Sequence, residues 1–292
     1  MKNKFYIYFF FFLFLKITNS FSQNLDSLFN DPPKSQETEY ATATFKTTRI
    51  ILGHSVENPA KNELLFTISH SFGQMNSGAY QLFGLDQSTI RFGLEYGINK
   101  NLCVGVGRSS YEKTYDGYLK YKIFKQSTGK RNMPVTINLL VGTAINSLKW
   151  ADPTRKNYFS SRVSYETELM IARKFTENLS LQITPTYIHK NLVPRIIDQN
   201  DIFAIGFGGR YKITKRLAIA AEYYYLIPGQ TAKDNTNALA LGIDIDTGGH
   251  IFQIRISNAQ PMFDRAMITE TQGKWAKGDI FLGFNINRIF SL

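Results

Sequence analysis

Serine and histidine residues that are neighbours in the sequence are the first candidates for chemistry. His70 stands between Ser69 and Ser71, and His54 is followed by Ser55. A serine hydrolase needs a histidine within hydrogen-bond reach of the nucleophilic hydroxyl and a third polar group to orient the imidazole. On a β-strand, adjacent side chains point to opposite faces, so Ser69 and Ser71 point away from His70. A pair built across two strands stays open as an alternative, which leaves an outer-membrane lipid hydrolase as the least favoured function.

Metal ligands and reactive thiols are equally sparse. The four histidines are His54, His70, His189 and His250, and none has a second ligand at a spacing typical of a metal site. Cys103 is the only cysteine, so a disulfide within the chain is impossible, and we interpret it as a buried, inert thiol. We therefore expect no metal, no cofactor and no enzymatic activity.

A third set of chemistry-bearing residues is charged and alternates with apolar side chains. In residues 202–213, Phe203 and Phe207 fall on one face of an extended chain, whereas Ala204 and Arg210 fall on the other. The charged residues on the polar face of such stretches are Arg91, Glu95, Lys120, Lys122, Glu166, Glu168, Arg210, Lys212, Glu222, Asp244 and Arg255. Charged rings of this kind select solutes by attraction and exclusion, and the basic members would favour anions. The alternative is a closed network in which the basic and acidic groups pair and fill the interior.

The same alternation recurs from about Leu64 to the end of the chain and predicts the elements that position these residues. We expect about twelve strands in a transmembrane, up-and-down antiparallel β-barrel, since an even number of strands is typical of outer-membrane barrels. The predicted strands start near Leu64, Thr89, Leu102, Tyr115, Val135, Tyr158, Leu179, Ile202, Leu217, Ala238, His250 and Asp279. A barrel of this size lies between side-chain-filled and open barrels, so size alone leaves the state of the lumen undecided.

The connections between these strands alternate in length. Tight turns at 99–101, 176–178, 214–216 and 247–249 alternate with longer segments such as 73–87 and 258–278. Short turns on the periplasmic side and long loops on the outside are typical of outer-membrane barrels. A soluble, lipocalin-like barrel is the main structural alternative. The mixed charges and glycines of the polar face, with the 16 Tyr and 23 Phe of the chain, favour the membrane barrel.

The N-terminal region is expected to be separate from the barrel domain, residues 62–292. Residues 1–22 combine a basic start, a short apolar run and a small-x-small pattern, which predicts a cleaved signal peptide. Residues 23–61 are irregular, and we expect either a periplasmic lead-in or a segment inside the barrel. The formal net charge of +11 is spread along the chain without a dense run, so anionic lipid is a better partner than nucleic acid.

Several segments resemble a Bacteroidota family of membrane-bound β-barrel proteins of unknown function. The matching stretches are residues 48–56, 82–86, 107–117, 170–175 and 247–250. The resemblance covers nearly all of the chain after residue 22. It implies a β-barrel in an outer membrane and brings no activity with it.

Taken together, these observations predict an outer-membrane β-barrel that acts as a narrow channel for small solutes, with anions favoured. The alternative is a non-conducting structural or binding barrel whose outer loops engage a partner.

Overall fold

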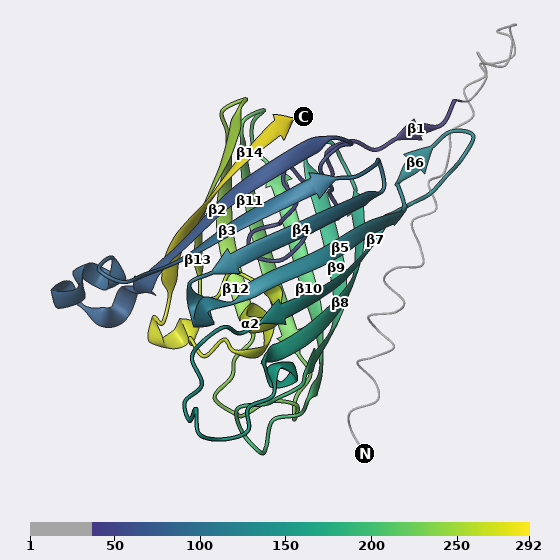
Figure 1. Ribbon diagram of the computed structural model, residues 1–292. Helices are drawn as coiled ribbons and strands as arrows, with labels where there is room; N and C mark the ends of the chain where they lie inside the picture. Colours follow the sequence, from purple (N-terminus) through teal and green to yellow (C-terminus); the bar gives the residue numbers. More distant parts are fainter. Residues whose placement is uncertain (1–36) are drawn as a thin grey trace, which may run out of the picture. The chain divides into compact units, whose positions relative to one another are not determined.

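The computed structural model describes residues 37–292, so the expected signal peptide at 1–22 lies outside the described residues. Twelve antiparallel strands form a closed barrel in the order β10-β11-β12-β13-β14-β2-β3-β4-β5-β7-β8-β9 (Figure 1). The strands are β2 (Glu63–Gln74), β3 (Ser88–Gly97), β4 (Leu102–Ser109), β5 (Tyr115–Phe124), β7 (Thr136–Ile145), β8 (Val163–Lys174), β9 (Leu179–Lys190), β10 (Asp201–Lys212), β11 (Leu217–Leu226), β12 (Ala238–Asp246), β13 (His250–Ser257) and β14 (Phe281–Ser291). Pairing of β14 with β2 closes the sheet, so none of the twelve strands has an unpaired edge.

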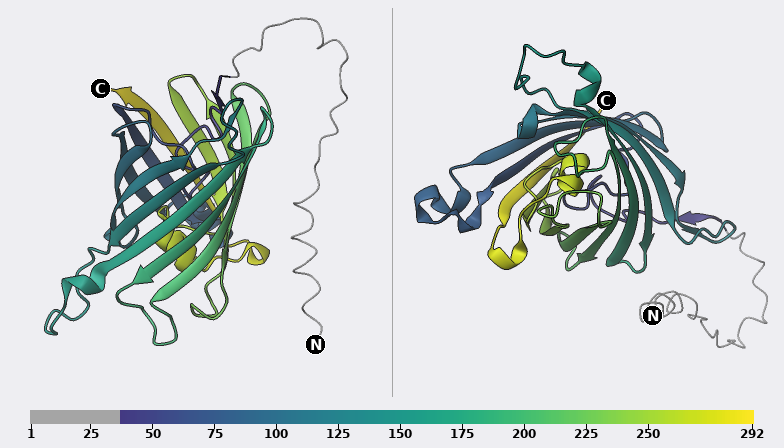
Figure 2. Two further views of the ribbon diagram at one scale, coloured as in Figure 1. Left: turned by 90° about the vertical axis from the view of Figure 1, so that its right-hand side faces the viewer. Right: turned by 90° about the horizontal axis from the view of Figure 1, so that it is seen from below.

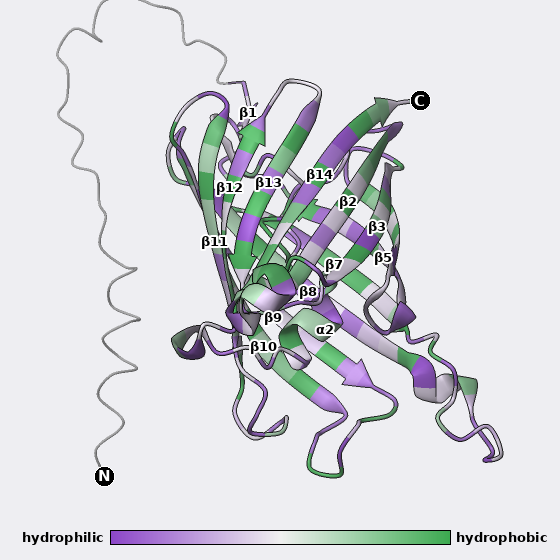
Figure 3. Ribbon diagram, turned by 90° about the vertical axis from the view of Figure 1, so that its left-hand side faces the viewer, coloured by the Kyte–Doolittle hydropathy of each residue, from purple (hydrophilic) through white to green (hydrophobic). Residues whose placement is uncertain are grey.

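The alternation in sequence becomes an alternation of faces. In β10, Phe203 and Phe207 are exposed on the outside, and Ala204 and Gly206 are buried inside. Figure 3 shows polar and apolar residues alternating along the strands in the same way. The apolar face therefore points outward and the polar face inward, which is the opposite of a soluble barrel with an apolar interior.

Most predicted strand starts agree with the structure to within two residues, and one does not. The strand expected near Tyr158 begins at Val163, because residues Phe159–Arg162 form the short 3-10 helix η5. The connections at the same end of the barrel contain four further 3-10 helices: η2 (Met75–Ser77), η3 (Ala79–Gly84), η4 (Tyr111–Lys113) and η6 (Trp275–Lys277). Among the described residues no helix is long and apolar enough to cross a membrane.

A small second sheet lies at the end of the barrel that carries the short turns. Strand β1 (Glu39–Tyr40) pairs with β6 (Ser127–Thr128), which belongs to the connection between β5 and β7. This pairing explains why that connection is longer than the other tight turns. It also ties the chain that precedes the barrel to the short-turn end.

Two segments that are not barrel strands lie inside the ring of strands (Figure 2, right). The first, which we call the plug hairpin, consists of residues 45–56, and the apolar side chains of Phe45, Ile51, Leu52 and Val56 in it are buried. The second, the inward loop, consists of residues 258–273 between β13 and β14. It contains the helix α2 (Asp264–Thr269), all six residues of which are buried.

Candidate functional site

The plug hairpin is a tight turn of the chain inside the barrel. Arg49 and His54 form an antiparallel bridge, the amide of Ile50 donates to the carbonyl of Gly53, and the amide of Ser55 donates to the carbonyl of Thr48. These bonds satisfy only part of the hairpin backbone. Backbone polar groups that are buried without partners are costly, so the remaining groups must find partners on the barrel wall.

Acidic and amide side chains of the wall supply many of those partners. Glu222 of β11 accepts hydrogen bonds from the amides of Ile51, Leu52 and Gly53, at 3.2, 2.7 and 3.2 Å for the shortest contact of each. Gln182 of β9 accepts from the amide of Val56 at 3.0 Å and donates to the carbonyl of His54 at 2.7 Å. Side chains of the wall therefore bind the hairpin backbone directly, as the side chains of a binding site bind a ligand.

Other strands contribute contacts of the same kind. Gln253 of β13 donates to the carbonyl of Ile50 at 3.0 Å, and Asn285 of β14 donates to that of Ile51 at 2.8 Å. Lys120 of β5 donates to the carbonyl of Ser55 at 3.1 Å. The hairpin is thus held from several sides of the barrel at once.

Glycines on the inner face make room for the tip of the hairpin. A Cβ atom at Gly208 of β10 would lie 2.3 Å from Cδ1 of Ile50, and one at Gly242 of β12 would lie 3.3 Å from Ile51. The hairpin presents a glycine of its own, Gly53, where a Cβ atom would lie 1.9 Å from the hydroxyl of Tyr224. The glycines on the polar face of the strands therefore leave room for neighbouring side chains, including those of the plug hairpin.

The plug hairpin and the inward loop meet in a buried ionic cluster. Oδ2 of Asp264 lies 3.1 Å from Nη1 of Arg49 and 3.5 Å from Nε2 of His54, and Nη2 of Arg49 lies 3.1 Å from the same imidazole nitrogen. All three side chains are buried. The ring of His54 also packs edge-on against Tyr118 of β5, with 4.5 Å between the centroids. One carboxylate therefore joins two segments that belong to opposite ends of the barrel.

The surroundings of this cluster fix the charges that it carries. Burial disfavours a charged Arg49, but the combined attraction of Asp264, Tyr118, Glu95 and Asp116 outweighs this and raises the pKa of the guanidinium above its usual value. Burial, followed by the positive charges of Arg49, Lys120 and Arg91, holds the pKa of His54 well below its usual value of 6.5. At neutral pH, Arg49 is therefore charged and His54 is neutral.

The eleven charged residues expected to line the lumen divide into two groups. Seven contact the plug hairpin or a neighbouring charge. Glu222 and Lys120 bind the hairpin backbone, Glu95 accepts from the Thr48 hydroxyl at 2.8 Å, Lys122 lies 3.7 Å from Glu57, and Arg210 pairs with Asp244 at 2.7 Å. Arg91 pairs through Nε with Asp116 at 3.0 Å, a partner that the sequence reasoning did not include.

The other members are buried or half-buried without an acidic or basic partner in residues 37–292. Glu166 and Glu168 are buried on β8, and neither carboxylate oxygen of Glu168 has a hydrogen-bond partner. Arg255 donates through Nη2 to the carbonyl of His70 at 3.1 Å and leaves Nε and Nη1 unpartnered. Lys212 is half-buried near the short-turn end of β10.

Sequence reasoning missed Arg49, His54 and Asp264 as a cluster. A signal was present in both segments: residues 48–56 combine apolar and charged residues in a region that otherwise looks irregular, and residues 261–268 place apolar side chains on both sides of Asp264 and Arg265 in a predicted outer loop. Large apolar side chains that cluster in a loop indicate burial. The partner of this segment could not be read from the sequence, because contacts across a barrel depend on its closure.

The other candidates for chemistry stay apart. Ser69 and Ser71 are buried on the inner face of β2, whereas His70 lies on the outer face, where its ring stacks on that of Phe284. His189 pairs with Asp201 at 2.7 Å on the outside. Within residues 37–292 no hydrogen bond joins a histidine to a serine, and no group of three side chains is arranged to hold a metal ion.

Residues 45–290 match the family described as "Membrane bound beta barrel domain (DUF5777)", and the chain belongs to this family. The matched region starts within the plug hairpin, so the hairpin is part of the family's domain. Because a membrane-bound, closed antiparallel barrel with short turns at one end and long loops at the other is an outer-membrane architecture, the chain is an outer-membrane protein.

Solved structures with a similar outline are outer-membrane barrels. The NanC porin is 11% identical with a TM-score of 0.47, covering 78% of this chain and 99% of that one. An outer membrane channel from Pseudomonas putida F1 is 12% identical with a TM-score of 0.47, covering 89% and 100%. Outer membrane phospholipase A from Escherichia coli is 12% identical with a TM-score of 0.42, covering 79% and 91%. No sequence among the curated proteins matches this one.

Proposed function

We propose that this protein is a small-solute channel of the outer membrane, and that the arrangement described above is its closed state. The observation that carries the proposal is the chemistry of the inner wall. Glu222, Lys120 and Gln182 form hydrogen bonds with the backbone of the plug hairpin. If the hairpin leaves, these side chains face water, and the lumen becomes a polar, charged passage.

A barrel that is permanently filled does not require charged side chains on its inner wall. Charged side chains lose hydration when they are buried, and replacing them with well-packed apolar residues is often neutral or stabilising. The buried carboxylates of Glu166 and Glu168 illustrate the cost, because they have no cationic partner in the described part of the chain. These residues are accounted for if the wall is hydrated in an open state and covered by the plug hairpin in the closed state.

The elements that close the lumen are also suited to movement. Neither segment is a strand of the barrel, and both are held by side-chain hydrogen bonds, ion pairs and packing. The plug hairpin continues toward β1 at the short-turn end, whereas the inward loop belongs to the long-loop end (Figure 1). The Arg49–Asp264 pair connects them, so breaking this pair weakens the link between the two closing elements.

The expected preference for anions finds only weak support in the inner wall. Its basic residues are Arg91, Lys120, Lys122, Arg210, Lys212 and Arg255. The acidic residues, with Asp116 added, are equal in number. Any charge preference must therefore come from another part of the passage.

Planar bilayer recording of the full chain tests the channel. We expect rare openings from the wild-type protein and a higher open probability from Asp264→Asn, which removes the charge that holds Arg49. The matched control is Asp234→Asn, which breaks the exposed pair between Arg195 and Asp234 in the outer loops and should leave the recording unchanged.

Two further measurements make the result decisive. A heat-dependent shift in electrophoretic mobility reports whether each variant is folded, and hydrogen exchange of residues 45–56 reports whether the hairpin has been released. A folded Asp264→Asn protein with a released hairpin and no current would contradict the channel. That result would favour the alternative, a non-conducting binding barrel.

A further inference from the structure

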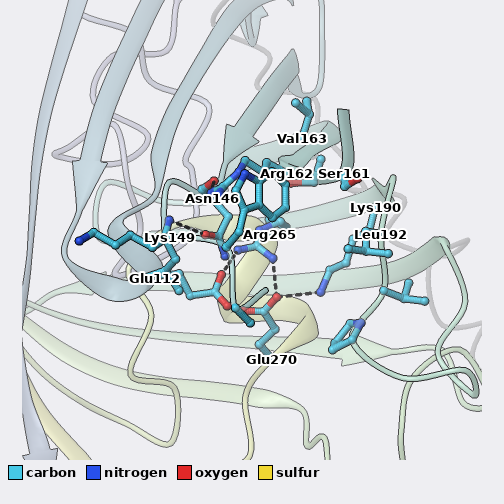
Figure 4. Close-up of a pocket in the computed structure, with 16 residues that line it drawn as sticks. Glu112, Asn146, Lys149, Ser161, Arg162, Val163, Lys190, Leu192, Arg265 and Glu270 are labelled. Atoms are coloured by element: carbon cyan, nitrogen blue, oxygen red, sulfur yellow. Dashed lines mark hydrogen bonds and ion pairs between the residues drawn. The ribbon is translucent and has the colours of Figure 1, made fainter. Parts of the chain in front are cut away.

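A basic cavity lies at the long-loop end of the barrel, outside the plug hairpin. It has a volume of about 300 Å³ and is bounded by the segment before β8, the end of β9 and the helix α2 (Figure 4). Its charged lining residues are Lys149, Arg162, Lys190, Arg265, Glu112 and Glu270. A volume of this size is at the lower end of the range for small-molecule sites.

The two carboxylates of the cavity are already engaged by two of its cations. Glu270 lies 2.8 Å from Nζ of Lys190 and also pairs with Arg265, and Glu112 lies 2.8 Å from Nη2 of Arg265. Arg162 and Lys149 have no acidic partner in residues 37–292. The cavity therefore has two more cations than carboxylates, which leaves a local excess of positive charge.

The unpaired guanidinium is held in place. The guanidinium carbon of Arg162 lies 3.6 Å from the centroid of the Trp150 ring, and its Nη1 donates to the carbonyl of Asn146 at 2.8 Å. Stacking on an aromatic face pre-organises a guanidinium and leaves its in-plane donors free. Across the cavity, Nε of Arg265 is buried and has no hydrogen-bond partner.

We propose that this cavity binds a small organic anion that carries two or more carboxylates. The cations come from separate elements, so one ligand with several anionic groups can engage more of them than a single small ion can. A guanidinium also matches a carboxylate through two parallel hydrogen bonds. The proposal deepens the proposed function and rests on it in one respect: it takes this anion to be the class of solute that the channel admits.

The position of the cavity gives it a connection to the closed lumen. Arg265 and Asp264 are consecutive residues of α2, and whereas Arg265 faces the cavity, Asp264 binds Arg49 of the plug hairpin. An anion that competes with Glu112 and Glu270 for Arg265 therefore acts one residue away from the contact that holds the hairpin.

Calorimetric titration of the folded full chain in detergent, with citrate as the probe, tests the site. We expect saturable binding of citrate, weaker binding of inorganic phosphate and no binding of glucose. The double variant Lys149→Gln, Arg162→Gln should bind citrate about tenfold or more weakly, because charge-assisted hydrogen bonds are lost. Arg131→Gln, an exposed arginine at the short-turn end, is the matched control and should bind as the wild type does.

Lack of saturable citrate binding to the folded wild-type chain would overturn the site, and so would equal binding by the double variant. Phosphate binding as tight as that of citrate would overturn the assignment to polycarboxylates. The titration requires no current, so the two proposals fail separately. Current without citrate binding removes this site alone. Citrate binding, with no current from a folded Asp264→Asn variant whose hairpin is released, removes the channel.

Discussion

Asp264 and Arg49 are 215 residues apart in the chain, and yet their side chains form an ion pair of 3.1 Å in the interior of the barrel. Asp264 belongs to a loop from the long-loop end, and Arg49 belongs to the chain that enters from the short-turn end. The pair therefore joins the inward loop to the plug hairpin inside the barrel.

Arg49→Met keeps the volume of the side chain and removes its charge, so Asp264 loses its main counter-charge. Removing one partner of a buried ion pair costs on the order of 3–5 kcal/mol. We expect this cost to appear as faster hydrogen exchange in residues 45–56, with exchange in the barrel strands unchanged. Arg195→Met, in an exposed pair, is the control. Unchanged protection of the hairpin would show that the pair does not hold it.

Glu222→Gln replaces a carboxylate that accepts from three consecutive backbone amides. Hydrogen bonds to a charged group contribute about 1.5–3 kcal/mol, and the variant keeps only one acceptor oxygen. We expect weaker protection of the amides of Ile51, Leu52 and Gly53 in particular. The control is Glu177→Gln at a surface turn. A uniform loss of protection across the barrel would instead indicate a general loss of stability.

Gly53→Ala places a methyl group against the hydroxyl of Tyr224, at 1.9 Å before any adjustment. Overpacking in a well-packed interior costs about 1–3 kcal/mol. We expect limited proteolysis to cut the variant within residues 45–56 at protease concentrations that leave the wild-type chain intact. Gly117→Ala is a matched control, since its nearest contact would be 3.7 Å away. Equal resistance of the two variants would contradict the close seating of Gly53.

Acidification should loosen the plug hairpin through His54. Its pKa in the seated hairpin lies well below 6.5, so as pH falls below 6.5 the released state takes up a proton that the seated state does not. The stability of the seated state is full above pH 6.5 and falls by about 1.4 kcal/mol for each pH unit below it. Asp264, Arg49, Tyr118, Lys120 and Arg91 surround the imidazole, and the cations oppose its protonation.

Hydrogen exchange of the hairpin measured between pH 7.5 and 5, and corrected for the intrinsic pH dependence of exchange, checks this prediction. His54→Gln keeps a polar side chain that does not titrate and should flatten the dependence. A wild-type profile that is flat over this range, or a variant that keeps the full dependence, would assign the effect to another group.

Sequence alone determined the barrel because its evidence is local. Side chains on a strand alternate between faces, so the stretch from Phe203 to Lys212 already separates a lipid face from a lumen face. The turns at 99–101 and 247–249 mark which connections are short. Even so, the strand expected at Tyr158 starts at Val163, because a boundary depends on how far the neighbouring strands pair.

Only the tertiary structure decided what fills the lumen. The sequence left open whether residues such as Lys120 and Glu222 line a pore, and whether the segment before the barrel enters it. Closure of the sheet brings β11 and β5 to the same hairpin and brings Asp264 to Arg49. Contacts of this kind join parts of the chain that share no pattern or spacing, since the hydrogen-bonding needs of a buried backbone can be met by any polar side chain that the fold brings within reach.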